Sequence, residues 1–158
     1  LEEVETIVLA ARVHDLGKIG VPDQVLLKAG PLDQEETRLI REHPGVGASI
    51  VGGLPFYRKA RELVLLHQEH YDGSGYPFGY RGEQIPLGAR IIAVADAFQA
   101  MTSDRPYRKA LPWSQARADL QRMAGTQFDP QVVTIFLTAL DEGTGRLSAS
   151  LAGSRAPS

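Results

Sequence analysis

Apolar residues recur along most of this chain at the spacing of an α-helix and not at the alternation of a β-strand. In the first segment Val4, Ile7, Val8 and Ala11 fall near a 3.6-residue period, which is typical of a helix with one buried face. The sequence contains no internal repeat and no alternating stretch of useful length. The pattern predicts an all-α fold, with helices over residues 1–16, 33–43, 46–51, 58–71, 88–102, 114–124 and 130–140.

Local signals set the ends of some of these segments. Asp33 is expected to cap a helix, because Glu36 stands three residues later, as in a capping box. Residues 72–87 are rich in glycine and proline and are predicted to form a loop. From position 142 the composition shifts to glycine, serine and alanine. We therefore expect a single domain over 1–141, followed by a flexible, disordered tail over 142–158.

Composition narrows the function classes. The net charge of -2 provides no basic field for long nucleic acid, so a small anionic ligand would need a local cluster of cations. Because the chain has no cysteine, a metal would be held by histidine, carboxylate or backbone oxygen. Apolar runs such as Ile91–Ala95 are too short to form a membrane segment, and we expect a cytoplasmic location. The first residue is Leu1, so we also expect the chain to be a piece of a longer protein.

The first candidate site is the segment His14-Asp15-Leu16-Gly17-Lys18. An imidazole beside a carboxylate suits a divalent ion, and the two oxygens of Asp15 could bridge two ions. Lys18 could meet a phosphate oxygen or protonate a leaving group. The alternative is that this segment is simply the end of a helix, with both side chains solvated.

The second candidate site joins a helix that carries His67 to the loop Asp72–Pro77, which reads Asp-Gly-Ser-Gly-Tyr-Pro. Glycines let the backbone approach a ligand closely, and Tyr76 could stack on a base or hydrogen-bond to a phosphate. The alternative is an ordinary turn.

The third candidate is Asp96, which lies in an otherwise apolar helix. A carboxylate buried there would be costly unless it were paired or bound to metal, so a metal ligand is favoured over an exposed polar edge.

A basic run follows this helix. Arg105, Arg108 and Lys109 form a local cluster that suits an anion. The alternative is a solvated run of charges.

Together and in order, these segments resemble the HD-GYP family. The resemblance covers residues 10–140, and it implies a helical bundle of the HD superfamily whose N-terminal helix is truncated here. The segments that carry it are His14–Lys18, Arg41–Pro44, Asp72–Pro77, Ile85–Arg90, Val94–Phe98, Thr102–Lys109 and Gly125–Pro130.

The resemblance also implies an activity, which is metal-dependent hydrolysis of cyclic di-GMP to pGpG or GMP in bacterial signalling. The metal ligands that it implies are His14, Asp15, His43, His67 and Asp96. Asp15 and Lys18 are implied as catalytic residues. The residues implied to bind substrate are Lys18, Gly75, Tyr76, Pro77, Arg105 and Arg108. We expect iron or manganese, with zinc or nickel as alternatives. A sensory or receiver domain before the chain, and protein partners in signalling, are also expected.

Two positions depart from the family pattern. Gln68 stands where the family has a second histidine after His67, and no histidine lies in residues 1–13, where the family has a further ligand. His70 could replace the missing imidazole or could be a solvated surface residue. The alternative function is therefore a weak or inactive module that binds cyclic di-GMP or a protein partner.

Overall fold

The computed structural model describes residues 2–104 and 109–153, and for residues 144–153 it describes the backbone alone. Within these ranges the chain is helical, with only an isolated bridge between Ala124 and Phe128 in place of any strand. No helix in this part of the chain is both long and apolar enough to cross a membrane. The α-helices are α1 (Glu2–Val13), α2 (Asp23–Leu26), α3 (Gln34–Arg41), α4 (His43–Gly52), α5 (Arg61–Leu66), α6 (Leu87–Thr102), α7 (Trp113–Arg122) and α8 (Pro130–Gly153). Three short 3-10 helices are η1 (Leu16–Gly20), η2 (Pro55–Ala60) and η3 (Gly82–Gln84).

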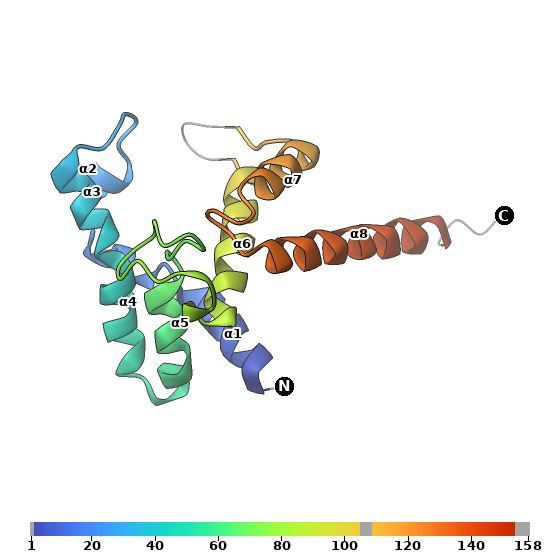
Figure 1. The fold of residues 1–158 in the computed structure, drawn as a ribbon. Helices are drawn as coiled ribbons and strands as arrows, with labels where there is room; N and C mark the ends of the chain where they lie inside the picture. Colours follow the sequence, from blue (N-terminus) through green and yellow to red (C-terminus); the bar gives the residue numbers. More distant parts are fainter. Residues whose placement is uncertain (1, 105–108, 154–158) are drawn as a thin grey trace.

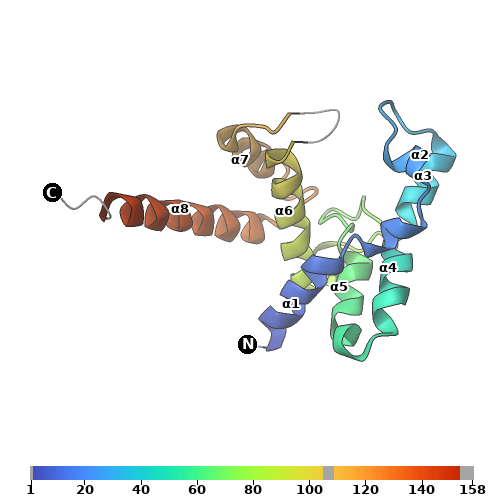
Figure 2. The same ribbon diagram turned by 180° about the vertical axis from the view of Figure 1, so that it is seen from behind.

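The first half of the chain forms one hydrophobic core. Helices α1 and α5 pack against each other and against α6, and α4 packs on α5, which lies between α4 and α1 in both views of the ribbon (Figures 1 and 2). Burial of apolar surface at these contacts stabilises the arrangement. The buried residues of this first core are Ala10, Val51, Ala60, Leu63, Val64, Leu66, Ile85, Ala89 and Ile92.

The C-terminal half of α6 begins a second core, which α7 and α8 complete. Helix α8 packs on α6 and α7 with its first turns and then projects away from the body of the domain (Figure 1). The buried residues of this second core are Val94, Phe98, Ala116, Leu120, Phe128, Val132, Val133 and Leu137. Helix α6 therefore joins two cores.

The all-α class predicted from periodicity is confirmed, and several helix ends are shifted. The capping box at Asp33 forms: its side chain accepts from the Glu36 N–H at 2.9 Å, and the Glu36 side chain accepts from the Asp33 N–H at 2.8 Å. The helices predicted over 33–43 and 46–51 are α3 and α4, with Glu42 between them, and Pro44 lies in the first turn of α4, where a missing N–H costs nothing. The helical backbone of α8 also continues beyond residue 142, where the tail was expected to begin, to Gly153.

Helix ends near the candidate site differ more. The first helix was expected to reach Leu16, but α1 ends at Val13, so that His14 and Asp15 lie in the turn that follows. The helix expected over residues 58–71 is the 3-10 helix η2 followed by α5, which ends at Leu66 with His67 as its C-cap. The side chains of interest therefore stand at helix ends, where the backbone is free to turn.

Candidate metal centre

The backbone fixes three histidine rings through the same kind of hydrogen bond. His14, His43 and His67 each donate an Nδ1–H to the carbonyl oxygen three residues earlier, at 2.8 Å for His14 and 2.7 Å for the other two. A neutral imidazole has only one N–H, so each Nε2 keeps its lone pair. Hydrogen bonds of this kind are typical of metal-binding histidines, because they fix the tautomer and the direction of the ring.

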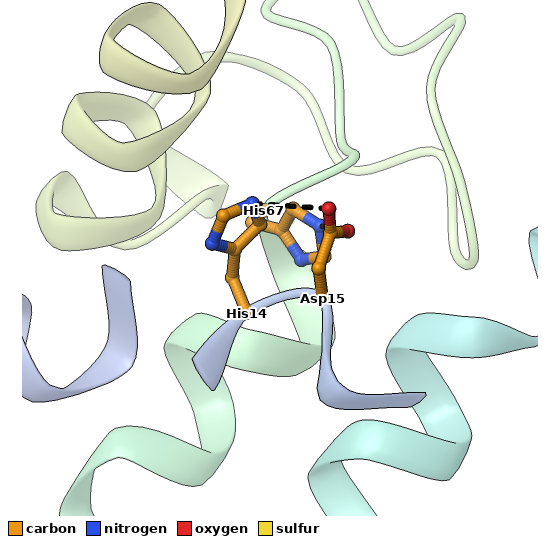
Figure 3. A group of neighbouring side chains, drawn as sticks. All are labelled: His14, Asp15 and His67. Carbon is orange, nitrogen blue, oxygen red and sulfur yellow. Dashed lines mark ion pairs between the residues drawn. The ribbon is translucent and has the colours of Figure 1, made fainter. Parts of the chain in front are cut away.

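Asp15 lies among these rings. Its Oδ1 atom is 3.5 Å from Nε2 of His43 and 3.9 Å from Nε2 of His67. Its Oδ2 atom is 3.6 Å from Nε2 of His14. Figure 3 shows the side chains of His14, Asp15 and His67 converging, and their ligand atoms all lie within 4.8 Å of one another.

The atoms that face the centre of this cluster are acceptors without donors. Nε2 of His43 and Nε2 of His67 are 3.3 Å apart, and two lone pairs at this distance repel unless a proton or cation lies with them. Nε2 of His14 and Oδ1 of Asp15 are buried and make no hydrogen bond within the described part of the chain. Because unsatisfied buried polar atoms are costly, the donor set fits a cation that prefers nitrogen and oxygen.

Close backbone packing brings these helix ends together. A Cβ atom on Gly17 would overlap the carbonyl oxygen of His43 and crowd the backbone nitrogen of Gly47. Only glycine therefore lets η1 lie against the first turn of α4. His43 is the first residue of that helix, so this contact sets the distance between His43 and Asp15.

Burial and charge divide the histidines into two kinds. Burial lowers the pKa of His43 and lowers that of His67 to about 4, so both rings stay neutral. Burial acts in the same direction on His14, but the Asp96 carboxylate, the Ala11 carbonyl and the Asp15 charge outweigh it and raise its pKa. His43 and His67 are therefore neutral and can bind a divalent ion through their lone pairs. At His14 a proton competes with such an ion.

Two further charged groups border the cluster. Asp96 Oδ1, from the middle of α6, lies 3.4 Å from Nε2 of His14, and the histidine lowers the pKa of this carboxyl. The Asp96 side chain is half-buried, at 31% exposure, and not fully buried as its apolar flanks suggested. On the other side Lys18 donates to Oδ2 of Asp15 at 2.6 Å, which places an ammonium group beside the carboxylate.

The glycine-rich loop is anchored by a residue that the motif analysis did not identify. Glu69 is only 3% exposed, and its two carboxylate oxygens accept the N–H groups of Phe78 and Tyr80 at 2.7 and 3.1 Å. Gly75 packs so closely that a Cβ atom there would overlap the backbone nitrogen of His70. The signal in the sequence was an acidic residue two positions after His67, but its loop partners are nine and eleven residues away.

The loop brings Tyr76 to the edge of the cluster. Its ring meets the His43 ring edge-on with centroids 6.5 Å apart, and the Arg41 Cζ atom lies over the same ring, 5.2 Å from its centroid. Burial raises the pKa of Tyr76; the charge of Arg41 opposes this shift, and those of Asp15 and Asp96 add to it. The Tyr76 side chain therefore links the cluster to Arg41, a residue of the segment Arg41–Pro44 to which sequence reasoning assigned no role of its own.

The structure brings together the five side chains that the resemblance implied as ligands. His70 lies apart from them: its Nδ1 is 3.0 Å from Ser74 Oγ within the loop. Pro77 follows Tyr76 in the loop and is exposed. Arg105 and Arg108 lie outside the described residues.

Comparisons with known proteins agree with this architecture. The profile of the family described as HD domain matches residues 2–132. The protein named cyclic di-GMP phosphodiesterase response regulator RpfG, from Xanthomonas campestris pv. campestris, is 44% identical over 156 residues, which are 96% of this chain and 41% of that protein. A protein named cyclic di-GMP phosphodiesterase from Thermotoga maritima is 41% identical over 136 residues, which are 85% of this chain and 37% of that protein. The chain thus spans well under half the length of these relatives.

A solved structure shares the fold. The crystal structure of V-cGAP3, described as a cyclic GMP-AMP-specific phosphodiesterase of Vibrio cholerae, superposes with a TM-score of 0.66 at 19% sequence identity. The match covers 88% of this chain and 38% of that one. By its profile match, its relatives and its ordered motifs, this chain belongs to the HD domain family, in its HD-GYP form.

Proposed function

We propose that this chain is a metal-dependent phosphodiesterase domain that hydrolyses cyclic di-GMP, giving pGpG, GMP or both. The observation that carries the proposal is the set of facing acceptors, with Nε2 of His43 and His67 3.3 Å apart and Nε2 of His14 and Oδ1 of Asp15 without hydrogen bonds. The printed names of the Xanthomonas and Thermotoga relatives support cyclic di-GMP as the substrate.

The residues that would hold the metal are His14, Asp15, His43, His67 and Asp96. Membership of the HD domain family implies a divalent metal. An ion in this position supplies Lewis acidity and a water molecule that ionises near neutral pH. Iron or manganese is our first expectation, because the donors are nitrogen and oxygen alone, and zinc or nickel suits the same donor set.

The other residues would bind and orient the substrate. Lys18 Nζ, already held beside Asp15, can donate to a phosphate oxygen or give a proton to the leaving oxygen. Gly75 lets the loop pack closely, and Tyr76 and Pro77, which follow it, would border the bound substrate. Arg105 and Arg108 are proposed to hold substrate phosphate on the basis of the sequence alone.

Turnover of cyclic di-GMP by the purified chain, without metal and with added Mn²⁺ or Fe²⁺, tests this proposal. We expect hydrolysis only with metal and its loss in Asp15→Asn, which keeps the size of the side chain but removes its charge. Glu62→Gln on the exposed side of α5 makes the same chemical change away from the cluster and should behave like the parent protein. Metal-independent turnover, or full activity of Asp15→Asn, would contradict the proposal.

A second function is supported by one position. Gln68 replaces an imidazole that the family pattern has, and a neutral amide is a weaker ligand. We therefore also propose, as the alternative, a module of weak or absent activity that binds cyclic di-GMP or a protein partner. Binding without turnover in the experiment above would favour it.

We further propose that the chain works as the output of a longer signalling protein in the cytoplasm. The name of the Xanthomonas relative includes a response regulator, and this chain covers 41% of that protein. A receiver or other sensory domain is the partner that we expect.

A further inference from the structure

We propose that Arg41, stacked on Tyr76, binds a phosphate of cyclic di-GMP other than the one hydrolysed at the metal centre. This inference rests on the proposed function and adds a subsite to it. Arg41 opens the segment Arg41–Pro44, but sequence reasoning assigned it no role, and the role proposed here follows from its contact with Tyr76.

The first observation is an exposed cation beside the site. The guanidinium of Arg41 makes no ion pair or hydrogen bond with any residue that the structure describes, and its contact is the face of the Tyr76 ring. Lys18, another cation at the cluster, is already paired with Asp15. Arg41 therefore has free N–H donors for an anion.

The second observation is that neighbouring carboxylates are occupied. Arg38, one turn earlier in α3, binds Glu35 at 2.6 Å and Glu42 at 2.5 Å. Glu42, the acidic neighbour of Arg41 in the sequence, is thereby drawn to the other arginine. Local pairing thus leaves Arg41 without the carboxylate that would otherwise compete with a ligand.

The third observation is the place of the Arg41 Cζ atom, 5.2 Å from the centroid of the Tyr76 ring and over its face. A guanidinium stacked on an aromatic face keeps its N–H groups in its own plane, around its edge, where they can fork onto two phosphate oxygens. The stack also limits the side chain to a few rotamers, so less entropy is lost on binding. The arrangement suits an oxyanion at the rim of the Tyr76 ring.

The position of Tyr76 indicates which phosphate this is. The Tyr76 ring meets His43 edge-on and also lies under the Arg41 Cζ atom, so Arg41 adjoins the cluster through Tyr76. Lys18 contacts the candidate ligand Asp15 directly, whereas the contact of Arg41 is with Tyr76, so Lys18 is the better placed of the two for the phosphate at the metal. A cyclic dinucleotide has a second phosphodiester, and we assign that group to Arg41.

The test is filter binding of radiolabelled cyclic di-GMP to the Mn²⁺-loaded protein within seconds of mixing, with turnover followed separately. Arg41→Ala should raise the dissociation constant about tenfold at low salt, as expected for loss of a charge-assisted contact, and should leave metal content unchanged. The penalty should shrink at high salt, because an exposed ion pair is screened. For bis(p-nitrophenyl) phosphate, which has one phosphate, KM should not change.

The matched control is Arg122→Ala, which removes an exposed arginine of α7 that pairs with Asp119. It should bind cyclic di-GMP like the parent protein. Parental binding by Arg41→Ala, an equal penalty at low and high salt, an equal change in KM for both substrates, or loss of metal would each overturn the assignment.

The two proposals fail differently in this experiment. If the parent protein turns over cyclic di-GMP and Arg41→Ala binds it equally well, the subsite is wrong and the proposed activity stands. If binding depends on Arg41 but no turnover occurs, the subsite stands and the activity is wrong. A parent protein that binds no cyclic di-GMP contradicts both.

Discussion

The two cores that α6 joins are built differently. The first core lies beside three buried polar side chains, namely His43, His67 and Glu69. The second core is apolar throughout, and the buried polar residue next to it, Asp129, is neutralised by Arg90 at 2.5 Å. The ligand-rich region thus contains unsatisfied acceptors, whereas the α7–α8 region satisfies its one buried carboxylate.

This difference indicates that the first region carries the candidate metal site, whereas the second region mainly stabilises the fold. In the first region the important residues stand at helix ends, because His14 follows α1, His43 begins α4 and His67 caps α5. In the second region the important residues are in helix interiors and face one another, as ordinary core residues do. Substitutions should therefore separate metal binding from global stability.

The largest effect is expected where packing sets the site. Gly17→Ala should lower the free energy of unfolding by about 3 kcal/mol or more and abolish metal binding, because the new methyl group overlaps the His43 carbonyl. Chemical denaturation and metal analysis measure both. Gly45→Ala in α4 is the control, since its Cβ would meet nothing within 4 Å. If Gly17→Ala folds and binds metal normally, the close approach does not position His43.

In the second core, Leu120→Ala should lower the free energy of unfolding without changing metal binding. Leu120 is fully buried, and removing such a side chain typically costs about 2–5 kcal/mol. Under native conditions the metal content per folded chain should equal that of the parent protein. A loss of metal in the folded variant would show that the two regions are coupled through α6, against the separation drawn above.

A smaller effect is expected at the loop anchor. Glu69→Gln replaces an acceptor oxygen by an NH₂ group, which then faces a backbone N–H of Phe78 or Tyr80. We expect kcat/KM for cyclic di-GMP to fall about tenfold, mainly through KM, with metal content unchanged. Glu62→Gln, on the exposed side of α5, serves as the control. A fall in kcat together with loss of metal would place Glu69 at the metal and not at the loop.

The smallest effect is expected at His70. Its Nδ1 faces Ser74 and not the cluster, so His70→Ala should leave metal affinity unchanged, whereas His67→Ala should lower it sharply. Isothermal titration with Mn²⁺ compares the two. Equal losses would mean that His70 compensates for Gln68 as a ligand.

Sequence reasoning placed α7 more exactly than the helix ends near the candidate site. The predicted segment 114–124 differs from α7 by one residue at its start and two at its end, because a regular amphipathic pattern decides where it forms. Near the site the end of α1 and the short length of α5 were missed, because tertiary contacts such as that of Gly17 with His43 decide them.

Sequence motifs identified the candidate ligands, but they did not identify the groups that hold these side chains in place. The carbonyl partners of the three histidines lie in the preceding helical turn of each ring, and a residue pattern does not show which nitrogen they bind. Glu69 and Arg41 gain their roles from partners that only the folded loop supplies.

The central claim is that five side chains from four segments hold a divalent ion. Equilibrium dialysis against Mn²⁺ followed by elemental analysis of the purified protein tests this most directly, with Asp15→Asn as the matched variant. The account predicts about one bound ion per chain in the parent protein and a large loss in Asp15→Asn, whose amide cannot supply the negative charge among the rings. A parent protein that binds no Mn²⁺, Fe²⁺ or Zn²⁺, or an Asp15→Asn variant that binds as much as the parent, would contradict it.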